Sequence, residues 1–161
     1  MSKLQAQKRV LKFQDLDDLL REIQSLHSAG YVCHGNWNLS QILGHLNDWT
    51  RFPMEGFPIP PLPIRMMFWV MSKTIGPGMR RKILKQGFSN GMPTAPQTIP
   101  HADALSETAA IEQFEQTIER LRNFQGTMYP SPLFGAMDRE LAITVSLLHA
   151  EHHLGFLEPR R

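Results

Sequence analysis

Apolar residues recur every three or four positions in four separate parts of the chain. This spacing places them along one side of an amphipathic helix, which buries that side against a core. Asn38 and Asp138 are suitable N-caps for the second and fourth segments, and Gly30 is a suitable end for the first. The pattern therefore predicts four main helices, at about residues 14–28, 38–52 and 105–124, and from 138 into the last part of the chain.

The middle of the chain breaks this pattern. Four prolines fall within residues 58–63, and neither a helix nor a central strand tolerates them. Residues 64–86 predict a helix interrupted at Gly76-Pro77-Gly78, and residues 87–100 are rich in turn-forming residues. The predicted fold is therefore all-α, with four main helices in a bundle and a long, partly irregular middle connection.

Length and composition indicate one globular domain over residues 1–161, with 42% hydrophobic and 20% charged residues. A net charge of +2 gives no reason to expect nucleic acid as a partner. The single cysteine, Cys33, excludes an intramolecular disulfide. The N-terminus has no apolar core of signal-peptide type, and the longest apolar stretch, 62–71, is about half a membrane span. We therefore expect a cytoplasmic protein with no membrane partner.

Three histidines lie close together near the end of the chain, at His149, His152 and His153. Residues four apart share a helix face, so His149 and His153 can direct two imidazoles at one point. His45 lies within the apolar stripe of the second helix, and helical bundles build metal sites from such inward side chains. Three histidine ligands with one vacant position are typical of catalytic zinc, although nickel and iron accept the same ligands.

His152 and Asp48 are candidates for a supporting acid–base role. His152 lies about 60° and about 100° around the helix from the two ligands, so it can replace either one, support one or move a proton near neutral pH. Asp48 follows His45 by three residues and can orient an imidazole or a coordinated water. The ordinary alternatives are core histidines with one hydrogen-bond partner each and a carboxylate at the bundle rim. Glu151 is expected to face solvent.

Two patterns in the middle connection have more than one interpretation. The basic residues within 80–85 can bind an anionic ligand, or they can form a solvated helix face. The Met- and Phe-rich segment 64–71 can line an adaptable pocket, although core packing is the simpler explanation. This segment and the loop 88–100 are the candidate walls of a substrate pocket.

Three stretches of the sequence carry a family resemblance. WNLSQILGHLNDW at 37–49, PLFGAM at 132–137 and LLHAEHHLGFLEP at 147–159, around the proline-broken middle, resemble the DUF1569 family of the DinB-like superfamily. The resemblance implies a four-helix bundle of DinB/YfiT type. It also implies a metal held by one histidine of the second helix and two of the fourth, which by position are His45, His149 and His153.

The wider superfamily includes metal-dependent thiol S-transferases that use low-molecular-weight thiols such as bacillithiol or mycothiol, and a maleylpyruvate isomerase. A metal ion with an open position lowers the pKa of a bound water and stabilises a thiolate. We therefore expect a metal-dependent enzyme, a thiol S-transferase or a hydrolase, that activates a thiol or water against a small-molecule substrate. The alternative is a non-catalytic interaction or dimerisation module with a structural or vestigial metal site. A homodimer is compatible with either class.

Overall fold

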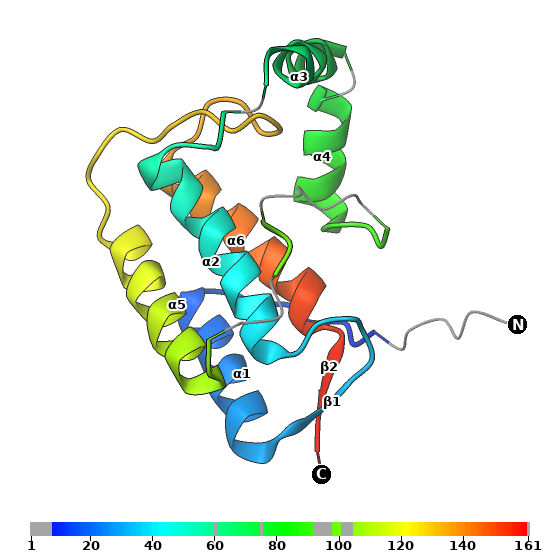
Figure 1. The fold of residues 1–161 in the computed structure, drawn as a ribbon, viewed down its shortest axis with the longest axis vertical. Coiled ribbons are helices and arrows are strands. Elements are labelled where there is room, and N and C mark those ends of the chain that lie inside the picture. Colours follow the sequence, from blue (N-terminus) through cyan, green and yellow to red (C-terminus); the bar gives the residue numbers. More distant parts are fainter. Residues whose placement is uncertain (1–7, 60, 75, 92–97, 101–104, 161) are drawn as a thin grey trace, which may run out of the picture.

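The computed structural model describes residues 8–59, 61–74, 76–91, 98–100 and 105–160. Most of this chain is helical, which confirms the predicted all-α class (Figure 1). In chain order the elements are α1 (Leu16–Ala29), β1 (Tyr31–Cys33), α2 (Leu39–Glu55), α3 (Leu62–Thr74), α4 (Gly76–Gln86), α5 (Glu107–Arg122), α6 (Arg139–Leu154) and β2 (Leu157–Pro159).

Helices α1, α2, α5 and α6 share the main hydrophobic core and are called the core helices below (Figure 1). They correspond to the four amphipathic segments predicted from the sequence. Each contributes side chains that are at most 1% exposed, among them Leu19, Leu43, Phe114 and Leu154. Burying one such side chain contributes about 1.5–3 kcal/mol, so this shared core dominates the stability of the fold.

A polar N-cap begins each core helix and fixes where it starts. The capping side chain accepts a hydrogen bond from a backbone N–H of the first turn. Asn38 forms a full capping box, because its own N–H also donates to the Gln41 side chain at 3.0 Å. The predicted caps Asn38 and Asp138 are thereby confirmed. The four caps are Asp15, Asn38, Ser106 and Asp138.

Helix α2 continues through Pro53, past the predicted helix end at residue 52. Pro53 lies inside α2, and the helix ends only at Gly56, whose φ of 111° is open to glycine but strained for other residues. Pro53 lacks one N–H, while its carbonyl accepts a hydrogen bond from Tyr129 N at 2.8 Å. Only two helical residues follow it, so the helix tolerates the missing hydrogen bond near its end.

The middle connection forms two helices that differ from the prediction in detail. Gly76-Pro77-Gly78 opens α4 instead of interrupting a helix, because proline is compatible with the first helical turn. Ile83 of α4 is 2% exposed, and α4 packs against α6. Helix α3 packs chiefly on α4 and lies apart from the core helices (Figure 1).

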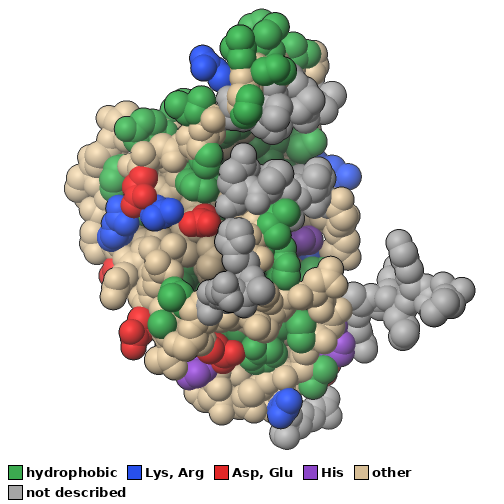
Figure 2. Space-filling model, in the orientation of Figure 1, with side chains coloured by type: hydrophobic (Ala, Val, Ile, Leu, Met, Phe, Trp, Pro, Cys, Tyr) green, Lys and Arg blue, Asp and Glu red, His purple; other side chains and the backbone are tan. Residues whose placement is uncertain are grey.

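The prediction that segment 64–71 packs in the core is wrong for its described side chains. Met66 and Trp69 are 63% and 65% exposed, and Val70 is half exposed. Apolar side chains gather on the surface where Figure 1 places α3 (Figure 2). No helix within the described ranges is both long and apolar enough to cross a membrane.

A two-stranded antiparallel sheet joins the α1–α2 connection to the C-terminal segment. Tyr31 pairs with Pro159 and Cys33 with Leu157, and His34 N extends the pairing by donating to Phe156 O at 2.8 Å. These strands are not predictable from the sequence, since three residues are too few to show an alternating pattern. The sheet fixes the end of α6 beside the start of α2.

The N-terminal segment 8–13 crosses the last turns of α6. Arg9 N donates to Gly155 O at 2.8 Å, and Phe13 N donates to Glu151 Oε1 at 2.8 Å. The prediction that Glu151 faces solvent is therefore wrong: the residue is 9% exposed and also accepts from Lys12 Nζ at 3.2 Å. Its carboxylate holds the segment on α6, on a side of the helix away from His149 and His153.

Candidate metal centre

His45 lies on the buried side of α2, with 3% of its surface exposed. Ile42 and Leu46, its neighbours on that side, are 1% exposed. The Nδ1 atom of His45 lies 2.8 Å from the carbonyl oxygen of Thr98. A neutral ring must donate from that nitrogen, so Nδ1 carries the hydrogen and Nε2 keeps its lone pair. The Thr98 carbonyl thus selects the tautomer in which Nε2 can bind a metal.

His149 and His153 lie one turn apart on α6 and direct their rings at His45. The Nε2 atom of His149 is 3.2 Å from Nε2 of His45 and 3.1 Å from Nε2 of His153. One ligand atom from each of the three residues lies within 4.8 Å of the other two. The structure therefore brings together the three residues that spacing and resemblance selected as ligands.

The distances from His149 Nε2 to the other two Nε2 atoms fit the edges of a tetrahedral metal site. Zn–N bonds are about 2.0–2.1 Å long, so two ligands of a tetrahedral zinc lie about 3.3–3.4 Å apart. His149 Nε2 lies 3.2 Å from His45 Nε2 and 3.1 Å from His153 Nε2, which is close to this value. Three neutral nitrogen donors also suit zinc, nickel or iron better than magnesium or calcium, which prefer oxygen. The residues present therefore fit a divalent transition metal with one position open.

All three imidazoles are neutral at pH 7. Burial lowers the pKa of His149 well below its usual value, and the neighbouring His153 and His45 lower it further. Burial, and then His45, lowers the pKa of His153 to about 2. Burial also lowers the pKa of His45. A neutral imidazole is the form that binds metal, so no proton has to be removed near pH 7.

Aromatic side chains enclose the three histidines. The Trp37 ring stacks on His153, with centroids 5.4 Å apart and planes 19° apart. Phe88 lies 4.9 Å from the His149 ring, and Trp49 meets the same ring edge-on at 5.9 Å. These contacts restrict the imidazole orientations and keep water away from their faces, which strengthens electrostatic interactions inside the site.

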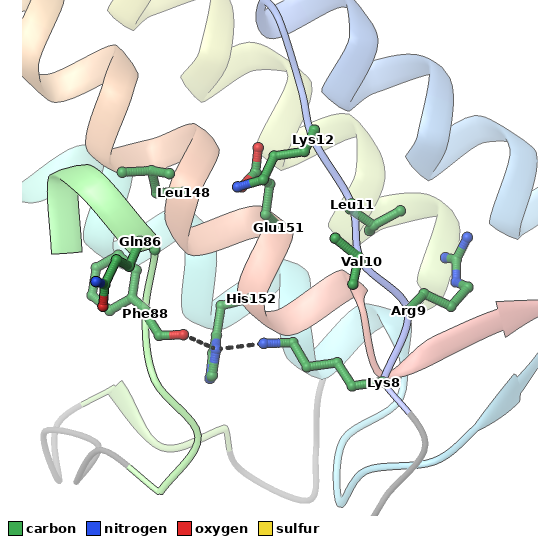
Figure 3. A pocket seen from close by; sticks show the side chains of 11 residues that line it. Lys8, Arg9, Val10, Leu11, Lys12, Gln86, Phe88, Leu148, Glu151 and His152 are labelled. Carbon is green, nitrogen blue, oxygen red and sulfur yellow. Dashed lines mark hydrogen bonds and ion pairs between the residues drawn. The ribbon is translucent and has the colours of Figure 1, made fainter. Parts of the chain in front are cut away.

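His152 lies outside this cluster, against a separate cavity (Figure 3). Its Nδ1 is 2.9 Å from Lys8 Nζ and 3.2 Å from Phe88 O, and its ring contacts the His153 ring edge-on at 4.9 Å. The cavity of about 170 Å³ lies between the N-terminal segment and residues 86–88. Burial, and then the Lys8 ammonium, lowers the pKa of His152 to about 4. The structure thus does not place it as a third ligand, and its acid–base role stays a prediction.

Asp48 lies at the rim, as the ordinary alternative expected. Its Oδ1 accepts from Arg51 at 3.2 Å, and a third of its side chain is exposed. In the described part of the chain no hydrogen bond joins it to an imidazole, although its charge raises the pKa of His45. Its catalytic role also stays a prediction.

The two candidate pocket walls have different outcomes. Residues 92–97 of the loop 88–100 lie outside the described residues, but Phe88 and the Thr98 carbonyl contact the histidines. Segment 64–71 makes no described contact with the three histidines. Trp37, Phe88 and Thr98 were not named as site residues from the sequence. The aromatic pair could have been found from its proximity to histidine segments, but a backbone carbonyl leaves no signal in the residue type.

Fold and site together define a mostly helical protein with a candidate three-histidine metal centre between two of its core helices. The family model DUF1569, described as "Protein of unknown function (DUF1569)", matches residues 5–160. The chain belongs to this family. No curated protein and no solved structure matches the chain significantly.

Proposed function

We propose that this chain is a metal-dependent enzyme built on a DinB/YfiT-like four-helix bundle. Its site would activate a thiol or a water molecule for attack on a small electrophile, in the manner of a thiol S-transferase or a hydrolase. His45, His149 and His153 would hold one divalent ion, with zinc as the first choice and nickel or iron as alternatives. The supporting observation is the convergence of three histidine nitrogens within 4.8 Å of one another, with His149 Nε2 at 3.2 and 3.1 Å from the other two.

The protein's own residues would prepare the ion in three ways. Thr98 fixes the His45 tautomer, the one-turn spacing on α6 fixes the other two ligands, and Trp37 and Phe88 shield the rings. Three ligands leave one tetrahedral position for a substrate atom. A transition metal held there supplies Lewis acidity, which lowers the pKa of a coordinating thiol or water toward neutrality.

Metal analysis of protein purified without a histidine tag tests the site. We expect one transition-metal ion per chain in the wild type and loss of that ion in His149→Ala. His27→Ala is the matched control, since His27 lies on α1 and contacts Glu107 instead of the cluster. The metal-site proposal would be refuted if the wild type lacked stoichiometric metal after growth and dialysis with zinc. It would also be refuted if the His149→Ala variant kept its metal.

Activity separates the enzyme from the alternative, a non-catalytic interaction or dimerisation module with a structural or vestigial ion. Conjugation of low-molecular-weight thiols to a panel of electrophiles, and hydrolysis of an ester and amide panel, would be measured with the metal-loaded protein. We expect turnover that chelation and His45→Ala abolish. A fully metal-loaded protein that is inactive across both panels, or spectroscopy that shows four protein ligands, would instead support the module.

A further inference from the structure

Helix α3 exposes a row of apolar side chains, called the apolar stripe below. Leu62, Met66, Trp69 and Val70 recur at helical spacing, and each is between 50% and 66% exposed. Side chains in one such row share one helix face. Large apolar patches on the surface of a protein mark interaction sites for protein or membrane. The metal centre makes no use of this stripe.

The charge of the same region is strongly one-sided. Residues 56–102 contain six basic residues and no acidic residue, although the whole chain carries only +2. The rest of the chain therefore has a net charge of −4. The six basic residues are Arg65, Lys73, Arg80, Arg81, Lys82 and Lys85.

Among the described side chains, four of these cations are exposed, one on α3 and three on α4. Arg65 is exposed and lies between Leu62 and Trp69 in helical spacing, so it borders the stripe directly. On α4, Arg81, Lys82 and Lys85 are exposed at positions that share a face, the basic stripe. In the described ranges no ion pair joins Arg65 or the basic stripe to an acidic group. Their charge is available to an external partner.

We infer that the α3–α4 segment, residues 62–86, binds the surface of a membrane that contains anionic lipids. Its stripe of Leu62, Met66, Trp69 and Val70 would enter the boundary between headgroups and acyl chains, with Arg65 and the basic stripe on the lipid phosphates. An exposed apolar helix face bordered by Lys and Arg fits such a surface. Tryptophan is also the side chain that favours this boundary.

The length of α3 requires that it lie on the membrane instead of crossing it. Thirteen helical residues extend about 20 Å, whereas the hydrocarbon core is about 30 Å thick. The sequence-based expectation of no membrane partner rests on the lack of an apolar stretch long enough to span a bilayer. Binding to the membrane surface does not require such a stretch. The net negative remainder of the chain would be repelled by the same lipids, so the α3–α4 segment also determines the orientation.

A second copy of the chain is a less suitable occupant. In a symmetric dimer the same patch meets itself, so two segments with six basic and no acidic residues would face each other. Like charges brought together at an interface are unfavourable. An anionic membrane instead combines an apolar interior for the stripe with negatively charged headgroups for the basic residues.

Vesicle flotation with the full-length protein tests the inference. We expect the wild type to float with vesicles of phosphatidylcholine and phosphatidylserine, only weakly with phosphatidylcholine alone, and less at high salt because the attraction is screened. Met66→Asp with Val70→Asp should abolish flotation. Arg81→Gln with Lys82→Gln should lower the partition coefficient about twenty-five-fold, since each basic residue contributes about fivefold.

The matched controls carry the same changes far from α3. Val10→Asp with Val32→Asp alters two exposed apolar residues, and Arg21→Gln with Arg160→Gln removes two exposed charges. Both pairs should float like the wild type. Circular dichroism and metal content identify any variant that has lost its fold, and Met66→Ser with Val70→Ser then replaces a misfolded aspartate pair.

Three results would overturn the inference. The first is a wild type that does not float with anionic vesicles. The second is flotation that the Met66 and Val70 substitutions leave unchanged. The third is a wild-type dimer in light scattering that these substitutions convert to a monomer, in a protein that binds no vesicles, because a second copy then covers the stripe.

Discussion

Lowering the pH should destabilise the metal-free protein through its buried histidines. His152 and His153 have pKa values lowered to about 4 and about 2, chiefly by burial, and that of His149 is lowered in the same direction. In the unfolded chain each imidazole regains a pKa near 6.5. Below that pH the unfolded state binds more protons than the folded state, so acid favours unfolding.

The size of this loss of stability can be worked out by counting one proton bound per histidine on unfolding. A neutral folded imidazole contributes stability that is fully present above pH 6.5 and falls by about 1.4 kcal/mol for each pH unit below it, until the folded pKa is reached. At pH 5.5, His152 and His153 together would account for about 3 kcal/mol, and His149 adds to this loss. Domains of this kind have about 5–15 kcal/mol in total. The loss is therefore a large part of the free energy of unfolding.

Urea denaturation of chelator-treated protein at several pH values between 7.5 and 5 measures this loss. We expect a flat free energy of unfolding above pH 7 and a steep decline below 6.5. His152→Gln keeps an amide near Lys8 and Phe88 but cannot titrate, so its decline should be shallower by about 1.4 kcal/mol per pH unit. A wild-type free energy that stays constant down to pH 5, or a variant with the same slope, would refute the reasoning.

Three further predictions concern the core, the N-terminal segment and the ion. Phe114→Ala should lower the free energy of unfolding by about 3–5 kcal/mol in urea denaturation, because the side chain is 1% exposed; a loss below 1 kcal/mol would contradict the described core. Glu151→Ala should cost about 1.5–3 kcal/mol by leaving Phe13 N without its acceptor, and Glu151→Gln clearly less; equal losses would show that this hydrogen bond is unimportant. Zinc at about 100 times its Kd should stabilise the wild type by about 2.7 kcal/mol in thermal melts but not His153→Ala; an equal shift in both would indicate binding elsewhere.

The core helices and the clustering of the three histidines could be predicted because their signals are local. Each helix combines an apolar stripe with a polar cap a few residues away, as at Asn38 and Asp138. The cluster needed only that His149 and His153 share a helix face and that His45 interrupts an apolar stripe. Both patterns depend on spacing within single helices, which the sequence records directly.

The features that were not predicted depend on partners distant in the sequence. Glu151 is buried because residues 12 and 13 cross α6. The residues next to Glu151 in the sequence give no sign of that contact. The His45 tautomer depends on the Thr98 carbonyl, 53 positions away, which any residue type could supply. The apolar stripe of α3 has the same residue spacing as a helix of the core. Hydrophobic spacing shows which side chains share a face, but it does not show what that face packs against.

Helix α4 connects the two regions for which functions are proposed. Its basic stripe faces outward, Ile83 is buried, and two residues after its end Phe88 lies against His149. Ile83 and the hydrogen bond from Arg80 to Phe134 O hold α4 on the rest of the protein independently of α3. Substitutions at Met66, Val70, Arg81 and Lys82 should therefore change vesicle binding while metal content stays the same. Conversely, His149→Ala should lose the ion and still bind vesicles, since neither stripe contacts the histidines in the described structure.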